Sequence, residues 1–385
     1  MSADPGRLRV VVDAGTYAVA PERCTGVGLR ALELAEVFAE RFDVLLLSGD
    51  VADAHDRGLR VPEPPAPGTW TDVVADADVV VFFDSPVRDR LEAALDGRPR
   101  VVSETTPPIE HLQYRSVAGA ADPVAAYAPE RGVFQLQVDR SDHFVCRSRV
   151  ERATLAAALV SRGRVEPGDI PRSPELAHLL SLVPVGYAPS SAASAAAGRA
   201  RRLADFVWTG GLWPFYDPES LVRAVRRCHD IGHPVTAAFL HAVPHEDTRE
   251  VLGRIRGLVA ELDLGEAVLL VDRPLPPGER DAALRGAAAA VCVGRPGVEN
   301  DTCVRLRIRD TRLHGIPLLV DPYGATADEV ARDGCGVVLP STDPRVIADA
   351  LVEAVARPLP RRAPDGRFDY AQTTKEFQQW MLRSA

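Results

Sequence analysis

The segment Val291–Gly315 reads VCVGRPGVENDTCVRLRIRDTRLHG, and the order of its residue types decides the fold. A short β-branched run ends at Val293, a turn follows at Pro296-Gly297, and an arginine-dense stretch then runs to Gly315. This order predicts a strand, a loop and a helix that begins near Thr302. The N-terminus of a helix that follows a parallel strand binds anions, because its first amide hydrogens have no partner within the helix. The segment therefore predicts a phosphate site.

The spacing of the charged residues predicts which of them share a helix face. One face carries Arg305, Arg309 and Arg312, and another carries Cys303, Arg307 and Asp310. The helix amides and arginines on one face would hold a diphosphate, and an acidic residue two turns in would accept hydrogen bonds from a ribose diol. Spacing alone leaves open an ordinary amphipathic helix with Arg307 and Asp310 as a surface pair.

The same residues resemble the donor-binding motif of retaining GT-B glycosyltransferases. The match is to the family-4-like group (glycosyl transferases group 1), which contains sucrose synthases and bacterial mannosyltransferases, and in particular to a bacterial branch. The branch pattern of Glu, Arg-x-Arg, Asp and Gly falls on Glu299, Arg305, Arg307, Asp310 and Gly315. The wider family usually has two glutamates separated by seven residues, whereas this chain has Asp310 and, eight places earlier, Thr302.

The resemblance implies an α/β fold of the GT-B type, with two Rossmann-like doubly wound domains facing a central cleft. It implies catalytic roles for Arg305 and Arg307 on the leaving diphosphate, for Glu299 near the sugar, and for His111. It implies donor contacts by Gly26, Gly28, Gly210, Gly211, Arg273, Cys303 and Asp310. The donor would be a nucleoside-diphosphate sugar, with UDP or GDP favoured, and no cofactor or metal would be needed.

The N-terminal part of the chain has the pattern of a parallel α/β domain. A strand at Leu8–Val12 is followed by Thr25-Gly26-Val27-Gly28, by a mostly apolar helix at Leu29–Glu40 and by a strand at Val44–Leu47. The third glycine and the acidic residue of a nicotinamide site are missing, which disfavours that function. The glycines permit either close approach of a ligand or tight packing. The stretch TGVGLRALELA also resembles the first loop of the GT-B branch, which adds Arg30 to the candidates.

Polar residues follow the next predicted strands, Ala77–Phe83 and Val101-Val102. The loop SETTPPIEHLQY carries Glu104, Glu110 and His111 just after a strand's carboxyl end, where ligands bind in open α/β sheets. His111 is either a solvent-exposed loop residue or, as a similar segment in the branch implies, a polar contact to the donor sugar or acceptor. Acid and base chemistry at the sugar ring would need a second carboxylate, for which Glu104 and Glu110 are candidates.

Composition predicts two domains and a boundary near Tyr187. We expect an N-terminal acceptor-side domain at 1–187, a flexible linker at 188–204 where PSSAASAAAGRAR lacks large apolar residues, a nucleotide-sugar domain at 205–363, and a C-terminal helix at 364–385 that packs on the first domain. The predicted strands of the second domain are 206–208, 235–240, 267–271, 289–293, 318–320 and 337–338.

Three features of the second domain allow a structural as well as a functional interpretation. Gly210-Gly211 follows the first strand and permits a diphosphate to approach the backbone. Trp213 is expected to pack in the core, and His241 and His245 are expected to be loop residues without a metal. Arg273 ends a strand at the level where the family contacts the nucleobase.

Composition excludes several functions. The 385 residues carry a net charge of −9 without a basic stripe, which argues against general nucleic-acid binding. The start MSADPGRLRV shows no secretory signal, and no apolar run approaches the ~20 residues needed to span a bilayer. Six cysteines lack metal-ligand spacing and fit reduced thiols in the cytoplasm: Cys24, Cys146, Cys228, Cys292, Cys303 and Cys335. The sequence is compatible with a homodimer but does not decide the oligomeric state.

The function predicted is metal-independent, front-face transfer of a sugar from a nucleoside diphosphate to a small-molecule acceptor, as in antibiotic biosynthesis. The absence of a basic amphipathic helix for membrane docking favours a small acceptor. The sequence shows no pair of carboxylates with clear nucleophile and acid roles, which disfavours a glycoside hydrolase. Three alternatives stay open: a transferase for cell-surface polysaccharide, a nucleotide-sugar epimerase or pseudo-glycosyltransferase, and an inactive nucleotide-sugar-binding partner subunit.

Overall fold

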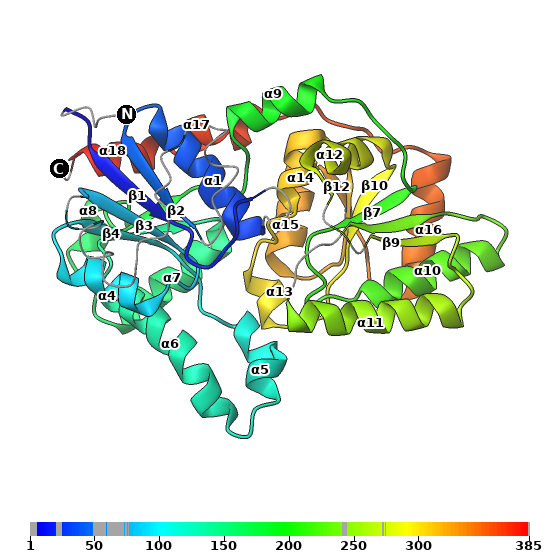
Figure 1. Ribbon diagram of the computed structural model, residues 1–385, viewed down its shortest axis with the longest axis horizontal. Coiled ribbons are helices and arrows are strands. Elements are labelled where there is room, and N and C mark those ends of the chain that lie inside the picture. Colours follow the sequence, from blue (N-terminus) through cyan, green and yellow to red (C-terminus); the bar gives the residue numbers. More distant parts are fainter. Residues whose placement is uncertain are drawn as a thin grey trace. The chain divides into compact units, whose positions relative to one another are not determined.

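The computed structural model describes residues 6–20, 25–48, 59, 73, 75, 77–240, 245–271, 273 and 275–383. Cys24, His241 and the two residues that flank Arg273 lie outside this part of the chain. The chain divides into two compact units, whose elements are labelled in Figure 1. The first comprises Met1–Leu112, Ala121–Pro189 and Gly366–Ala385, and the second comprises Gln113–Ala120 and Ser190–Asp365.

The first unit is built on a parallel sheet with the strand order β2-β1-β3-β4-β5-β6. Its strands are Arg9–Asp13 (β1), Asp43–Leu47 (β2), Val79–Phe83 (β3), Arg100–Glu104 (β4), His143–Cys146 (β5) and Leu180–Leu182 (β6). The continuous apolar runs of β1 and β3 are buried, as expected for strands that are covered on both faces. Sequence periodicity missed β6, a three-residue strand.

Helices cover both faces of this sheet. They are α1 (Gly26–Ala39), α4 (Arg88–Asp96), α6 (Pro123–Arg140), α7 (Arg149–Ser161), α8 (Asp169–Arg172), α17 (Tyr370–Thr373) and α18 (Lys375–Arg383), with 3-10 turns at Glu110–Gln113 and Gly366–Phe368. Helices α1, α17 and α18 pack on one face, and α4, α6 and α7 cover the other (Figure 1). On the first face, the rings of Phe38 and Phe377 lie 5.7 Å apart, so the C-terminal helix is part of this core.

The second unit has a parallel sheet with the order β12-β11-β10-β7-β8-β9. Its strands are Phe206–Thr209 (β7), Ala237–Leu240 (β8), Val268–Val271 (β9), Ala289–Cys292 (β10), Leu318–Val320 (β11) and Gly336–Val338 (β12). Numbered within the unit, this order is the Rossmann order 3-2-1-4-5-6. Together the two sheets confirm the predicted α/β class with two Rossmann-like units.

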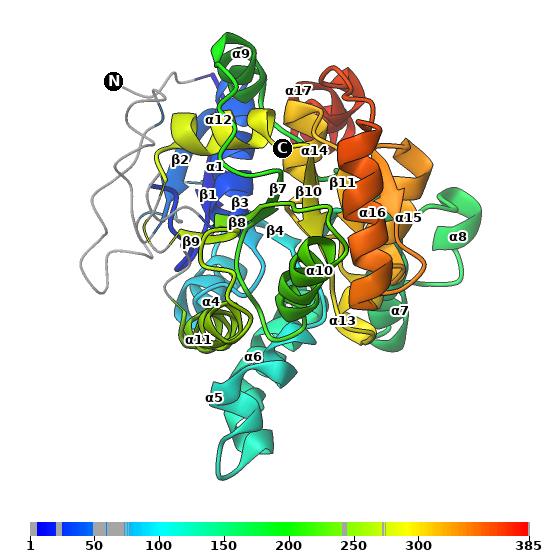
Figure 2. The same ribbon diagram turned by 90° about the vertical axis from the view of Figure 1, so that its right-hand side faces the viewer.

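The helices of the second unit are α5 (Arg115–Ala118), α9 (Pro189–Ala197), α10 (Pro218–Asp230), α11 (Glu246–Glu261), α12 (Pro277–Gly286), α13 (Val298–Thr302), α14 (Ile308–His314), α15 (Gly324–Asp333) and α16 (Pro344–Ala356). Figure 2 shows α10 beside α16, and these two helices pack against each other. The prediction of a flexible linker over 188–204 was wrong in part, because α9 occupies residues 189–197. Alanine is the strongest helix former, and five of the nine residues of α9 are alanine.

Each sheet has one position where the chain reverses the direction in which strands are added. In the first unit this position lies between β1 and β3, and in the second it lies between β7 and β10. The loops that leave the carboxyl ends of two such strands diverge, and ligands of open α/β sheets bind in the resulting crevice. A ligand site is therefore expected at the loops after Asp13, Phe83, Thr209 and Cys292.

Candidate functional site

The Gly210-Gly211 loop follows β7 at the reversal point of the second unit. Gly210 has φ +78°, a left-handed conformation that a side chain disfavours. A Cβ atom added to Gly211 would lie 2.7 Å from the Trp213 ring nitrogen, so close packing requires the second glycine. The loop thus brings bare backbone to the edge of the sheet.

Arg307 lies against this loop. Its Nη2 donates a hydrogen bond to the Gly211 carbonyl oxygen at 3.1 Å. Its guanidinium carbon lies 4.3 Å from the centre of the Tyr216 ring and 5.1 Å from that of Trp208. The buried Nη1 atom has no hydrogen-bond partner, and among the described residues Arg307 has no carboxylate partner. A buried guanidinium nitrogen without an acceptor requires an explanation, and an oxygen supplied by a ligand or by water would satisfy it.

The aromatic rings hold Arg307 without neutralising it. Tyr216 is buried, and burial raises the pKa of its hydroxyl even though Arg307 opposes the rise. The phenol therefore stays neutral at physiological pH and offers the guanidinium a ring face. Cation–π contacts of this kind leave the N–H groups free for a ligand.

Arg305 is placed differently from the expectation that it contacts a diphosphate. Its side chain is buried and forms an ion pair with Asp321 at 2.5 Å. It also donates to Asn300 Oδ1 at 2.9 and 3.1 Å and to the Cys292 carbonyl oxygen at 3.2 Å. Nε, Nη1 and Nη2 all have partners within the chain. The structure gives Arg305 the task of tying α13 to the ends of β10 and β11.

The predicted helix near Thr302 was wrong. Helix α13 ends at Thr302, and α14 begins at Ile308. The Cys303 amide donates to the Glu299 carbonyl oxygen at 3.0 Å, so it closes α13 and offers no free donor to an anion. Arg305 lies between α13 and α14, and its amide donates a hydrogen bond to Thr326 Oγ1 on α15 at 3.0 Å. This tertiary contact interrupts the helix, and the regular arginine spacing therefore does not define a helix face.

Glu299 and Asp310 are both buried. Glu299 lies in the short helix α13 and not in the expected loop. Asp310 accepts from Arg280 Nη2 at 2.5 Å and lies 3.6 Å from Arg309 Nη1. Burial alone would raise the pKa of Asp310, but these two arginines lower it, so the carboxylate is charged. Contacts of Glu299 with a sugar and of Asp310 with a ribose stay predictions.

Three further residues that the sequence singled out, Arg273, Trp213 and His245, lie in the second unit. The Arg273 side chain is exposed and pairs with Glu279 at 3.2 Å. Trp213 is half-buried and not a core residue, and its ring stacks on Tyr114 with centroids 5.4 Å apart. His245 caps α11 by accepting from the Asp247 amide, as a loop residue at a helix start.

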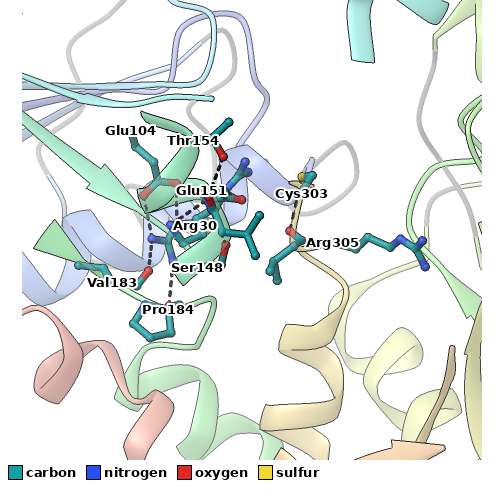
Figure 3. Close-up of polar contacts among 12 residues, drawn as sticks. Arg30, Glu104, Ser148, Glu151, Thr154, Val183, Pro184, Cys303 and Arg305 are labelled. Atoms are coloured by element: carbon teal, nitrogen blue, oxygen red, sulfur yellow. Dashed lines mark hydrogen bonds and ion pairs between the residues drawn. The ribbon is translucent and has the colours of Figure 1, made fainter. Parts of the chain in front are cut away.

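In the first unit, the glycine loop and Arg30 serve packing. A Cβ atom on Gly28 would lie 2.0 Å from the Ala18 carbonyl oxygen, whereas Gly26 is exposed at the start of α1. The Arg30 side chain is buried and forms two hydrogen bonds of 2.7 Å with Glu104 (Figure 3). The structure thus overturns Arg30 as a ligand contact and Glu104 as a free acid or base.

The Arg30 and Glu104 pair is enclosed by further acceptors. Arg30 donates to the carbonyl oxygens of Val183 at 2.8 Å and Pro184 at 3.2 Å (Figure 3) and to the Tyr370 hydroxyl at 2.8 Å. Burial would lower the pKa of Arg30, but the Glu104 carboxylate raises it. The guanidinium is therefore a charged link between α1, β4 and the segment after β6.

His111 lies between two carboxylates of the first unit. Its Nε2 lies 3.6 Å from Glu110 Oε1, and its Nδ1 lies 3.6 Å from Glu130 Oε2. Burial would lower the pKa of His111, but Glu110 and Glu130 raise it. The side chain is 16% exposed, so His111 is not a freely solvated loop histidine.

Tyr17, Asp84, Ser85 and Glu130 are polar residues near His111 that sequence reasoning did not identify. Asp84 directly follows the buried apolar run of β3, and Tyr17 lies four residues after β1. Their position after adjacent strands was the available signal. In the first unit the sequence prediction gave this weight to the loop after β4, which carries Glu110 and His111.

Two negative findings hold for the part of the chain that the structure describes. No group of three or more His, Cys, Asp or Glu side chains there is arranged to hold a metal ion. No helix in the same residues is long and apolar enough to cross a bilayer.

No protein-family model matches this sequence, and no curated protein matches it. Solved structures do match. HepE from Anabaena in complex with UDP-glucose has a TM-score of 0.67 and 13% identity, with 98% of this chain and 100% of that chain covered. Trehalose-6-phosphate synthase from Burkholderia multivorans has a TM-score of 0.61 and 12% identity, with 98% of both chains covered. Sucrose-phosphate synthase from Thermosynechococcus elongatus has a TM-score of 0.55 and 15% identity, with 98% and 94% covered.

At these identities the likeness establishes the fold. The protein has the GT-B fold of two Rossmann-like units that these glycosyltransferases share. A fold alone does not determine a function, which depends on the residues of the site.

Proposed function

We propose that this protein is a retaining glycosyltransferase that transfers a sugar from a nucleoside-diphosphate donor to a small-molecule acceptor. The observation that carries the proposal is the Nη1 atom of Arg307, which has no partner in the part of the chain that the structure describes and is held beside Gly210-Gly211 at the reversal point of the second sheet. The HepE structure supports the choice of donor, because that protein was solved with UDP-glucose and with UDP.

Arg307 would act on the leaving group. Cleavage of the bond between sugar and diphosphate leaves a developing negative charge on the diphosphate oxygen. A fixed guanidinium beside a glycine backbone stabilises that charge without reorganising, and preorganised electrostatic stabilisation is usually the largest catalytic contribution. Because Arg307 is fixed by Tyr216 and Gly211, the donor does not have to order it.

The remaining residues of the site would orient the donor. Asp310 would accept hydrogen bonds from the ribose, and Glu299 would face the sugar. We place the reaction in the cytoplasm and propose a front-face mechanism in which the diphosphate guides the acceptor's proton, with no metal. UDP is the first donor nucleotide to test, and GDP is the second.

Calorimetry on the full chain tests the proposal. We expect UDP or GDP to bind in EDTA as well as in magnesium, and Arg307→Lys to weaken that binding. Lysine keeps the charge but loses the planar fork that reaches two acceptors. Among the described residues Arg307 makes a single hydrogen bond, to the Gly211 carbonyl oxygen, so the substitution should leave the melting temperature nearly unchanged.

The matched control is Arg357→Lys, because that arginine is exposed and its ion pair among the described residues is a local one with Glu353 in the same unit. Equal nucleotide affinity in Arg307→Lys and Arg357→Lys would refute the assigned role. Binding that requires magnesium would refute the metal-independent mechanism. Nucleotide binding without turnover of any UDP- or GDP-sugar, in water or with an added acceptor, would favour an inactive binding subunit.

A further inference from the structure

A short segment of the chain, residues 113–120, belongs to the second unit although the residues on both sides of it belong to the first. The chain enters this segment after Leu112 and leaves it at Ala121, and the segment contains the one-turn helix α5. We call these eight residues the strap. Its contacts within the second unit show what it holds.

Two polar contacts anchor the strap to the start of α11. The Arg115 amide donates a hydrogen bond to Asp247 Oδ1 at 2.9 Å, and Arg115 Nη1 donates to Glu250 Oε2 at 3.2 Å. The Asp247 side chain is buried, so the strap amide supplies a buried carboxylate with a donor. The pair with Glu250 is exposed and contributes little. The strap backbone is therefore fixed at a defined place on α11.

Tyr114 makes the strap contact that leads to the Gly210-Gly211 loop. Its ring stacks on Trp213, with centroids 5.4 Å apart and an interplanar angle of 28°. The Trp213 ring lies directly against Gly211, because a Cβ atom on that glycine would be 2.7 Å from the ring nitrogen. The Gly211 carbonyl oxygen accepts the hydrogen bond from Arg307. A continuous row of contacts thus leads from the strap through Trp213 and Gly211 to Arg307.

Little apolar surface of the strap is buried. Val117 is buried, and Tyr114 is half-buried. The exposed residues of the strap are Gln113, Arg115, Ser116, Ala118 and Gly119. Segments with few buried apolar contacts open locally at a small cost in free energy. An opened strap would remove the stacking partner of Trp213, and the glycine loop would lose part of its support.

The residues after Trp213 are fixed without the strap. The Phe215 carbonyl oxygen accepts from the Arg295 amide at 3.0 Å and from Asn300 Nδ2 at 2.8 Å. The Tyr216 amide donates to the Trp213 carbonyl oxygen at 3.0 Å. The Trp213 side chain, in contrast, is held by ring contacts. Loss of the strap should therefore loosen the glycine pair before it loosens the rest of the loop.

We propose that the strap holds the Gly210-Gly211 loop in the conformation that presents Arg307 to a donor diphosphate, with Tyr114 as a positioning residue. The inference deepens the proposed function and rests on it, since the ligand is the same nucleoside diphosphate. Tyr114 acts through Trp213 and not on the donor itself. A loop that is already ordered does not have to be ordered by the ligand, so the affinity for the nucleotide depends on the strap.

The test compares Tyr114→Leu with Tyr114→Phe in the full chain. Calorimetry measures the affinity for UDP and GDP below the melting transition of each variant. We expect Tyr114→Leu to bind the nucleotide about threefold to tenfold more weakly, the range that loss of an aromatic pair predicts. Tyr114→Phe keeps the ring and should bind within about twofold of the wild type. Wild-type affinity in Tyr114→Leu, or an equal loss in both variants, would overturn the proposal.

A double variant shows whether Tyr114 acts through Arg307. Arg307→Lys already weakens the contact with the anion, so Tyr114→Leu should weaken binding by less than about twofold in that background. Residues that act independently give losses that multiply in full. Such fully multiplied losses would overturn the route from the strap to Arg307.

The matched controls are Tyr127→Leu and Tyr127→Phe, because Tyr127 is a half-buried tyrosine of the first unit whose hydroxyl donates to the Pro108 carbonyl oxygen. Both should bind nucleotide like the wild type, and a loss equal to that of Tyr114→Leu would count against the proposal. If Tyr114→Leu does not fold, as judged by its melting curve, Asp247→Ala takes its place. That change removes the acceptor of the Arg115 amide and should weaken nucleotide binding in the same range. Unchanged affinity in Asp247→Ala would then overturn the proposal.

Hydrogen exchange without nucleotide separates this inference from the proposed transferase. Amides of residues 210–213 should exchange faster in Tyr114→Leu than in the wild type or Tyr114→Phe, and unchanged exchange would refute the hold of the strap on the loop. Tight nucleotide binding that Tyr114→Leu leaves unchanged would refute the positioning role and leave the transferase standing. No binding of UDP or GDP by the wild type would refute the proposed function, and the exchange rates alone would then decide whether the strap holds the loop.

Discussion

The buried pair of Arg30 and Glu104 yields a stability prediction that separates a structural from a catalytic glutamate. Glu104→Gln keeps the size of the side chain and removes its charge. Arg30 then loses its anionic partner while it stays enclosed by the Val183 carbonyl oxygen and the Tyr370 hydroxyl. Removing one member of a buried ion pair leaves an uncompensated charge and costs roughly 3 to 5 kcal/mol.

A loss of this size is large enough to see directly. Each kcal/mol shifts the melting temperature by roughly 2 to 4 °C for a domain of 150 to 250 residues. We therefore expect Glu104→Gln to melt roughly 6 to 20 °C below the wild type in differential scanning calorimetry. Since the chain has two units, the transition that shifts should be the one that belongs to the first unit.

A double variant makes the reasoning sharper. Arg30→Met/Glu104→Leu removes both charges and keeps similar volumes, so no charge is left buried without a partner. Such replacements are often neutral or stabilising, and we expect the double variant to melt above Glu104→Gln. The reasoning would be refuted if Glu104→Gln melted within 2 °C of the wild type while abolishing turnover, because Glu104 would then act on the substrate.

Two further predictions concern a buried histidine and the donor ribose. Burial lowers the pKa of His143 to about 4, below its unfolded value of about 6.5, so stability is full above pH 6.5 and is lost as the pH falls toward 4. We expect a loss of about 3 kcal/mol from this group across that window. His143→Gln should show a shallower fall in melting temperature between pH 7 and pH 4.5, and parallel pH profiles would contradict the assignment. For the ribose, Asp310→Asn should bind UDP and 2′-deoxy-UDP with nearly equal affinity in calorimetry. An equal preference already in the wild type would rule out the diol contact.

Local sequence patterns predicted the fold because strands and helices are local features. The apolar runs that became β1, β3, β7 and β11 stand between polar loops, and their alternation with helix-length segments fixes a parallel α/β architecture. The segment Thr302–Ile308 failed for a tertiary reason. Its arginine spacing satisfies a helix, but the bond from the Arg305 amide to Thr326 holds the backbone in another conformation.

The site was predicted where it depends on one loop and missed where it depends on several. Gly210-Gly211 could be found because a glycine pair after a strand is visible in the sequence itself. Asp84 could not be linked to Tyr17, since 67 residues separate them and only the order of the strands makes them neighbours. Arg30 and Glu104, 74 residues apart, were separately assigned to a ligand for the same reason.

Arg305 and Arg307 show why a motif does not assign the same role to all of its residues. They are two positions apart, yet Arg305 pairs with Asp321 at 2.5 Å, while the Arg307 Nη1 has no acceptor among the described residues. A buried arginine without partners would be costly, so the chain supplies Arg305 with a carboxylate, an amide and a carbonyl oxygen. Arg307 instead rests on aromatic rings, which stabilise a cation but accept none of its in-plane hydrogen bonds. Loss of Arg305 should therefore be expressed first as instability, and loss of Arg307 first as weaker binding of an anion.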